Sequence, residues 1–241
     1  MKPVVLSKRL QAVADMVTKG NRVCDVGCDH GFVSIYLVEQ GISSSVLAMD
    51  VRSGPLGAAM EHVTERKLQG VIQTRLSDGL HKYNIGEADT LICAGMGGKL
   101  MMRILSAEKE KTDSFRELVL QPQSELEEFR RFLFQSGYAI VQENMIEEDG
   151  KFYPIMWVVK AQGMEKEPGV LAFRYGPVLL EKKSPVLWAY LQKEERVYQE
   201  ILKQLMERGL EEPGRKQRYQ EVSQMLEECQ TARNMIQSNR I

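Results

Sequence analysis

The sequence has few of the residues that mark secreted, metal-binding and membrane proteins. It has four cysteines and three histidines among 241 residues, without a C-x-x-C pair or histidines at zinc spacing, so neither a disulfide framework nor a bound metal is expected. No stretch approaches the roughly 18 apolar residues of a membrane span. Residues 1–20 have the pattern of an amphipathic helix and not of a secretory signal. We expect a cytoplasmic monomer that binds no metal and no membrane.

An excess of charge of one sign is also missing. The 32 lysines and arginines and the 33 aspartates and glutamates nearly cancel, and the net charge is −1. The chain therefore lacks the overall basic field that favours nucleic acid, and any such contact must come from local basic patches. Hydrophobic residues make up 43% of the chain, enough for a sizeable core.

A glycine-rich turn lies between an apolar, β-prone run and a helix-like segment, in residues 23–31 (VCDVGCDHG). A strand, a glycine turn and a helix form the entry to a nucleotide-binding α/β sheet. The spacing of Asp25, Gly27 and Gly31 differs from G-x-G-x-x-G, with Asp29 in place of a middle glycine. Carboxylates there would repel a dinucleotide's pyrophosphate and favour a cationic ligand such as S-adenosylmethionine. By itself, the motif leaves open an ordinary glycine turn of any α/β protein.

The order of elements is more informative than this motif. The expected strands are 22–27, 45–50, 71–76, 89–94 and 117–120, and the expected helices are 6–17, 32–40, 54–69, 99–105 and 124–136. A Ser-x-x-Glu capping box, Ser124 to Glu127, is expected to open the last of these helices. Two further β-prone runs, 138–147 and 151–160, flank an Asp-Gly turn and predict a hairpin. We predict an α/β fold with a Rossmann-like, seven-stranded methyltransferase sheet, because dehydrogenase sheets tend to stay parallel.

After about residue 162 the strand signals stop. Helix-favouring sequence runs to the end, with interruptions near 184–185 and at 209–214, and predicts an antiparallel coiled-coil hairpin of two long helices. We expect a cofactor-binding methyltransferase domain at 1–161 and a C-terminal helical domain at 162–241. The basic clusters 182–183 and 215–218 could contact phosphates or form ordinary solvated surface.

Polar residues and glycines follow the predicted strands. Asp50 ends the second strand, where a carboxylate holds ribose hydroxyls in this class of sheet, although it could instead cap the next helix. Asp78 and Gly79 follow the third strand and could reach an adenine amino group. Residues 95–98 (GMGG) follow the fourth strand and leave room for a ligand or a substrate ring.

These motifs together resemble the bacterial tRNA adenine-N1 methyltransferase family, which modifies adenosine 22 in the D-arm. The likeness covers about residues 5–160, and the helical hairpin also fits that family. It is carried by residues 25–31, 52–55, 77–80, 94–98, 120–122 and 147–153. Two positions depart from the family pattern: Gln123 stands where Asn is usual, and Asp50 where Glu is frequent.

The resemblance implies S-adenosylmethionine-dependent methylation of tRNA and assigns roles to single residues. Asp29 and His30 are the candidates for steering the target base, with a purely structural His30 as the alternative, while His62 and His81 need no function. The implied cofactor contacts are Asp25, Gly27, Asp29, Gly31, Asp50, Val51, Asp78, Gly79, Gly95 and Met96.

The position of attack and the RNA contacts follow from what surrounds the fourth strand. The Asn/Asp-Pro-Pro-aromatic clamp that holds an exocyclic amine is missing, which favours the ring nitrogen N1. Because N1 is hidden in a paired base, the enzyme must take that base out of its stack. The expected RNA or substrate contacts are Lys8, Arg9, Arg52, Arg103, Gln121, Gln123 and Tyr153. A methyltransferase of another RNA or of a small molecule, and a non-catalytic cofactor-binding scaffold with a protein partner, remain the alternatives.

Overall fold

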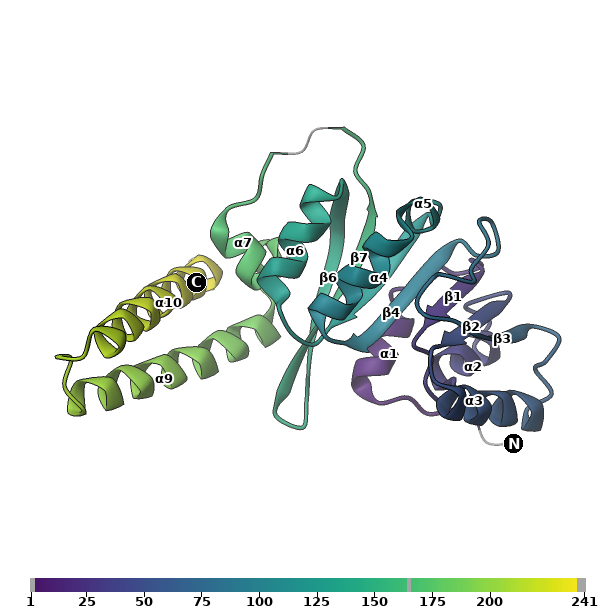
Figure 1. The fold of residues 1–241 in the computed structure, drawn as a ribbon, viewed down its shortest axis with the longest axis horizontal. Helices are drawn as coiled ribbons and strands as arrows, with labels where there is room; N and C mark the ends of the chain where they lie inside the picture. The colour runs from purple at the N-terminus through teal and green to yellow at the C-terminus, as the bar shows by residue number, and fades with distance from the viewer. Residues whose placement is uncertain (1–2, 164–165, 238–241) are drawn as a thin grey trace. The chain divides into compact units, whose positions relative to one another are not determined.

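The computed structural model describes residues 3–163 and 166–237 (Figure 1). Within them the chain divides into two compact units, Met1–Glu167 and Pro168–Ile241. The boundary predicted from sequence, after residue 161, lies just ahead of this division. Each unit is described by itself.

The first unit is built on one seven-stranded sheet with the order β3-β2-β1-β4-β5-β7-β6. The strands are β1 Val23–Val26, β2 Val46–Asp50, β3 Ile72–Leu76, β4 Thr90–Met96, β5 Glu117–Pro122, β6 Tyr138–Glu148 and β7 Lys151–Lys160. The first five are parallel, and β7 pairs antiparallel with both β5 and β6. The predicted methyltransferase sheet with a terminal hairpin is confirmed.

Helices cover both faces of this sheet because the central strands are buried on both sides. On one face, α1 (Lys8–Ala14), α2 (Phe32–Glu39) and α3 (Ser53–Glu65) supply buried apolar residues such as Val13, Ile35 and Val63. On the other, α4 (Gly98–Ala107) and α6 (Leu126–Gln135) supply Met101 and Phe129, with the short α5 (Lys109–Asp113) following α4. Because β1 to β5 run parallel, their carboxyl ends meet at one edge, where α/β proteins bind ligands.

Two local predictions at this edge are wrong. The fourth strand does not end at residue 94. Gly95 adopts φ +78° and shifts the register, but the strand pairs with β5 again at Met96. The capping box of α6 does not form either. The residue before the helix is Glu125, at φ +50° and without a side-chain cap, and the Ser124 hydroxyl accepts instead from the Gly98 N–H at 3.2 Å.

The second unit is helical. Its long helices, α9 (Pro185–Glu207) and α10 (Pro213–Gln237), pack side by side as an antiparallel pair and bury Leu191 and Cys229 between them (Figure 1). Ser184 caps α9 by accepting from the Leu187 N–H, as expected for a helix that starts at Pro185. Two short helices, α7 (Val170–Tyr175) and α8 (Pro177–Glu181), lie in the stretch before residue 184 that was expected to favour helix, but the break between them at Gly176 was not predicted.

Within residues 3–163 and 166–237, no helix is both long and apolar enough to cross a membrane. No group of three or more histidine, cysteine or acidic side chains could hold a metal ion there.

Candidate active site

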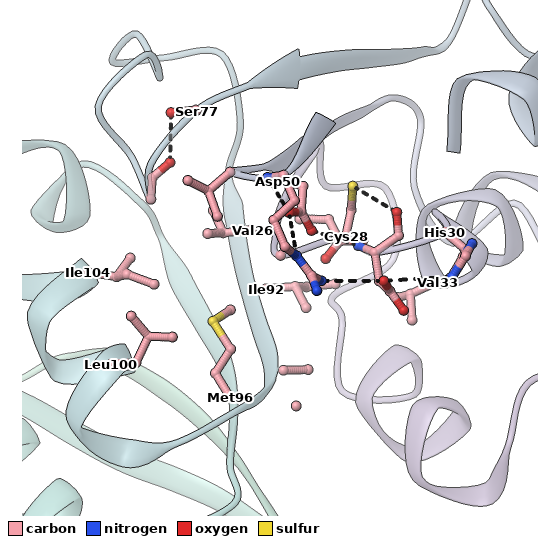
Figure 2. Close-up of a pocket in the computed structure, with 18 of the residues that line it drawn as sticks. Val26, Cys28, His30, Val33, Asp50, Ser77, Ile92, Met96, Leu100 and Ile104 are labelled. Carbon is pink, nitrogen blue, oxygen red and sulfur yellow. Dashed lines mark hydrogen bonds and ion pairs between the residues drawn. The ribbon is translucent and has the colours of Figure 1, made fainter. Parts of the chain in front are cut away.

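A cavity of about 690 Å³ opens at the carboxyl ends of β1, β2 and β4. Figure 2 shows the apolar side chains of Met96, Leu100 and Ile104 on one side of it and Cys28 and His30 on the other, with Asp50 between. Most of the residues that the sequence assigns to the cofactor line it: Asp25, Gly27, Asp29, Asp50, Val51, Asp78, Gly79, Gly95 and Met96. One sheet edge therefore collects motifs that are far apart in the chain.

Asp25 is the buried carboxylate at the inner end of the cavity. It lies in β1 and is only 5% exposed, and its Oδ2 accepts a hydrogen bond of 2.7 Å from the Ser34 hydroxyl on α2. Burial raises the pKa of the Asp25 carboxyl to about 6, against the bond from Ser34, and the nearby charge of Asp50 adds to the rise. A nearby positive charge would favour its ionised form.

Asp50 ends β2 with both carboxylate oxygens turned toward backbone amides. Oδ1 accepts from the Arg52 N–H at 2.8 Å and Oδ2 from the Asp29 N–H at 3.2 Å. The Asp50 side chain is 3% exposed, so its position is set by buried bonds and not by solvent. These bonds tie the β1–α2 turn to the end of β2 and leave lone pairs on both oxygens for a ligand.

Asp29 and His30 lie at the open side of the cavity. Asp29 adopts φ +51°, and its Oδ1 lies 3.6 Å from Arg52 Nη2 and 3.8 Å from His30 Nε2. The Asp29 side chain is 60% exposed, which leaves it accessible to a substrate. Asp29 and His30, the neighbouring residues predicted to steer the target base, therefore both line the cavity.

The glycines of the turn make room for close contacts. A Cβ on Gly27 would lie 2.8 Å from Met96 Cε, and Gly27 has φ +75°, so a side chain there would be both crowded and strained. Gly31 does not line the cavity. It lets α2 approach α3, because its Cβ would lie 3.1 Å from the Cβ of Ala59.

The β3 side of the cavity has a different character. Asp78 is exposed and lies 3.9 Å from Arg103 Nη2. The buried Ser77 hydroxyl donates to the Gly79 carbonyl at 2.9 Å and holds the turn in shape. Ile104 would be 3.1 Å from a Cβ on Gly79, so α4 and this turn form one continuous wall.

Arg9 is held at the mouth of the cavity by residues that the sequence assigned to the substrate. Its Nη1 donates to Gln121 Oε1 at 2.9 Å, and its guanidinium lies 5.6 Å from the centre of the Tyr153 ring. Gln121 Oε1 also accepts from the Gly95 N–H at 3.1 Å. Gln121 is fully buried, so it positions Arg9 and the Gly95 turn and does not present its own surface to RNA.

Some of the other predicted substrate residues lie outside the lining. Gln123 and Lys8 are exposed, and Tyr153 is half-buried. Arg52 and Arg103 line the cavity with Arg9. Cys28 also lines it, but burial raises the pKa of its thiol well above the usual range, so it is an apolar contact and not a nucleophile. Sequence reasoning missed Phe32, Leu100 and Ile104, which carry only the signal of helical amphipathicity.

Comparisons with known proteins show which family the chain resembles. A family model described as a methyltransferase domain matches residues 6–156. The chain is 34% identical over 212 residues to the tRNA (adenine(22)-N(1))-methyltransferase of Bacillus subtilis, which covers 83% of this chain and 87% of the relative. The solved structure of the B. subtilis M1A22 tRNA methyltransferase TrmK has a TM-score of 0.83 at 30% identity, over 95% of this chain and 99% of that one. Streptococcus pneumoniae Sp1610 in complex with S-adenosyl-L-methionine has a TM-score of 0.84 at 32% identity, over 95% of this chain and 100% of that one.

Proposed function

The chain belongs to the tRNA (adenine(22)-N(1))-methyltransferase family, and from this we propose that it methylates N1 of adenosine 22 in the D-arm of tRNA, with S-adenosylmethionine as the methyl donor. The observation that carries the proposal is one cavity that joins the buried Asp50 carboxylate to the Gly95–Met96 turn. A donor gripped at Asp50 and an acceptor entering past Asp29 would meet inside it.

The residues of the cavity fit S-adenosylmethionine. Its carboxylates suit a cationic ligand and would repel phosphates: Asp25, Asp29, Asp50 and Asp78. When bound, S-adenosylmethionine supplies an electrophilic methyl group on a positively charged sulfur. Asp50 would accept hydrogen bonds from ribose hydroxyls, Asp78 and Gly79 would contact the adenine edge, and Gly27 keeps the turn open beside Met96.

The target base needs orientation more than activation. N1 of adenine has an in-plane lone pair and requires no general base, so positioning supplies most of the rate. Methylation leaves positive charge on the purine, and a carboxylate close to the ring would stabilise the transition state. Asp29 suits this role, because its carboxylate is exposed at the mouth and its contacts with Arg52 and His30 are long.

The RNA would be held by cations around the mouth. Arg9, Arg52 and Arg103 line it, and Lys8 is exposed on the first turn of α1. Phosphate contacts of this kind supply affinity without an overall positive charge. Gln121 acts through Arg9, since its oxygen fixes the guanidinium.

The test is methylation of unmodified tRNA transcripts with labelled S-adenosylmethionine, followed by mass spectrometry of the digested product. We expect N1-methyladenosine at position 22, separated from N6-methyladenosine by retention time with alkali avoided throughout. A transcript with guanosine at that position is the matched control and should accept no label. N6-methyladenosine or a methylated guanosine would overturn the proposed geometry, and binding of S-adenosylhomocysteine without methylation of any RNA would favour the scaffold alternative.

We also propose that the C-terminal unit serves as a second grip on the tRNA, while the first unit carries the cofactor site. Exposed Lys182 and Lys216 support this assignment. A chain that ends at residue 167 should bind S-adenosylhomocysteine as the full chain does, because the sheet and cavity lie within the first compact unit, and should lose most tRNA methylation. Full activity of the shortened chain would refute the assignment. We further propose that the enzyme acts as a monomer in the cytoplasm. Light scattering of the purified protein, alone and with tRNA, tests the oligomeric state, and fractionation of cells tests the location.

A further inference from the structure

Three aromatic rings gather at the mouth of the cavity. The Phe32 ring stacks on His62 with centroids 5.0 Å apart and on His30 with centroids 5.9 Å apart, and the planes meet at 25° in both pairs. His30 and His62 are 6.2 Å apart. Phe32 and His30 line the cavity, and His62 extends the group along α3. We call these residues the ring cluster.

The local backbone explains why the rings meet. Gly31 lets the start of α2 pack closely against Ala59 of α3. A Cβ added at Gly31 would lie only 3.1 Å from the Cβ of Ala59. His62 stands one turn beyond Ala59 on the same helix, so it reaches the first residue of α2, Phe32. His62 Nδ1 lies 3.0 Å from the His30 carbonyl oxygen and fastens the loop to α3.

The ring cluster does not belong to the hydrophobic core. Phe32 is 42% exposed, and the His30 side chain is 48% exposed. None of the three is part of either group of buried apolar residues on the faces of the sheet. A single exposed apolar residue needs no explanation, but stacked rings at the mouth of a cavity offer a flat, aromatic surface to a ligand.

We propose that the ring cluster is a stacking platform for the base next to the target adenosine in the tRNA strand. Proteins recognise unstacked RNA bases by stacking them on Phe, Tyr, Trp or His side chains. Taking the target base out of its stack exposes a face of the neighbouring base, and a strand that enters the cavity would pass the cluster, because Phe32 and His30 line the cavity and are exposed. His62, to which the sequence assigned no function, then belongs to the substrate site. This inference rests on the proposed function.

The first test compares ring-removing and ring-keeping variants. Phe32→Leu keeps the apolar volume but removes the ring, and Phe32→Tyr keeps both. A stacked base contributes roughly 5- to 150-fold in affinity, so Phe32→Leu should weaken tRNA binding and kcat/KM at least about fivefold, while Phe32→Tyr stays close to the unmodified protein. His81→Ala is the matched control, because His81 is an exposed histidine paired with Glu108 outside the cavity lining, and it should change nothing.

The second test shows whether the ring meets an RNA base. A tRNA transcript with an abasic nucleotide on one or the other side of the target adenosine should bind the unmodified protein more weakly at one of the two positions. The same abasic transcript should cause no further loss with Phe32→Leu, because the partner ring is already gone.

The outcomes separate this inference from the proposed function. Three results would overturn the platform while the unmodified protein still methylates tRNA. The losses from Phe32→Leu and from the abasic transcript could add, Phe32→Leu could bind tRNA as tightly as the unmodified protein, or it could lose as much affinity for S-adenosylhomocysteine as for tRNA. Failure of the unmodified protein to methylate any tRNA would overturn the proposed function itself.

Discussion

Replacement of Asp50 is the sharpest test of the cofactor site. Its carboxylate is buried and accepts from the Arg52 and Asp29 amides, so Asp50→Ala removes the proposed ribose contact and leaves both amides without this acceptor. A hydrogen bond to a charged group contributes about 1.5–3 kcal/mol. The affinity for S-adenosylhomocysteine should fall roughly 10- to 150-fold, at about 1.4 kcal/mol for each factor of ten.

Calorimetry with S-adenosylhomocysteine measures this loss directly. Asp50→Glu keeps a carboxylate and should retain most of the affinity, in line with the Glu that is frequent in the family the sequence resembles. Asp78→Asn is the matched control on the other side of the cavity. The Asp78 side chain is 72% exposed, so its replacement should cost less than about a factor of five, as expected for a solvated contact.

Two results would refute this reasoning. If folded Asp50→Ala binds S-adenosylhomocysteine within a factor of two of the unmodified protein, Asp50 is only a structural acceptor for the turn. If Asp78→Asn loses more affinity than Asp50→Ala, the ligand is gripped from the β3 side. Circular dichroism and thermal unfolding of each variant keep misfolding apart from lost contacts.

Two further predictions concern packing around the site and behind it. Gly27→Ala should weaken cofactor binding, because alanine is strained at φ +75° and its Cβ would push aside Met96 Cε, 2.8 Å away. Calorimetry on Gly27→Ala with and without Met96→Ala shows how much of the loss is steric. Glu143→Gln should lower the free energy of unfolding by about 3–5 kcal/mol, since it breaks a fully buried pair with Arg130. The partly exposed pair of Glu127 and Arg131 on α6, the helix that also carries Arg130, provides the comparison. In urea denaturation, Glu127→Gln should cost less than about 1 kcal/mol, and equal costs for the two variants would contradict both estimates.

The sheet and much of the cavity could be predicted because they depend on local patterns. Apolar runs bounded by glycine define the parallel strands, and a residue that directly follows such a strand, such as Asp50 or Asp78, must lie at the carboxyl edge. That is why most predicted cofactor residues line one cavity.

The failures come from pairings between distant segments. Continuation of β4 past Gly95 depends on its partner β5, and Ser124 bonds Gly98 across two loops instead of capping its own helix. The link from Arg9 to Gln121 spans 112 positions. His62 meets Phe32 only because Gly31 lets two helices approach. No periodicity within one element carries information of this kind.

The buried Asp25 carboxylate gives the last prediction, a dependence on pH. Its folded pKa is about 6, against an ordinary value of 3.8, so between these values the folded state binds more protons than the unfolded state, and stability falls as pH rises. Above pH 6 the cost is complete, on the order of 3 kcal/mol at 1.36 kcal/mol per pH unit. Asp25→Asn should therefore be more stable than the unmodified protein at pH 8 and nearly equal to it at pH 4, measured by urea denaturation.

Ligand binding should show the reason for this cost. A cationic ligand favours the ionised form of Asp25, so the affinity of the unmodified protein for S-adenosylmethionine should exceed that of Asp25→Asn most at pH 8, and the gap should close as pH falls through 6. Arg52→Lys, a change at the exposed mouth, is the control and should leave this pH dependence in place. A gap that is the same at pH 5 and pH 8 would mean that Asp25 serves only to anchor Ser34, and the proposed contact with the positive charge of the donor would be wrong.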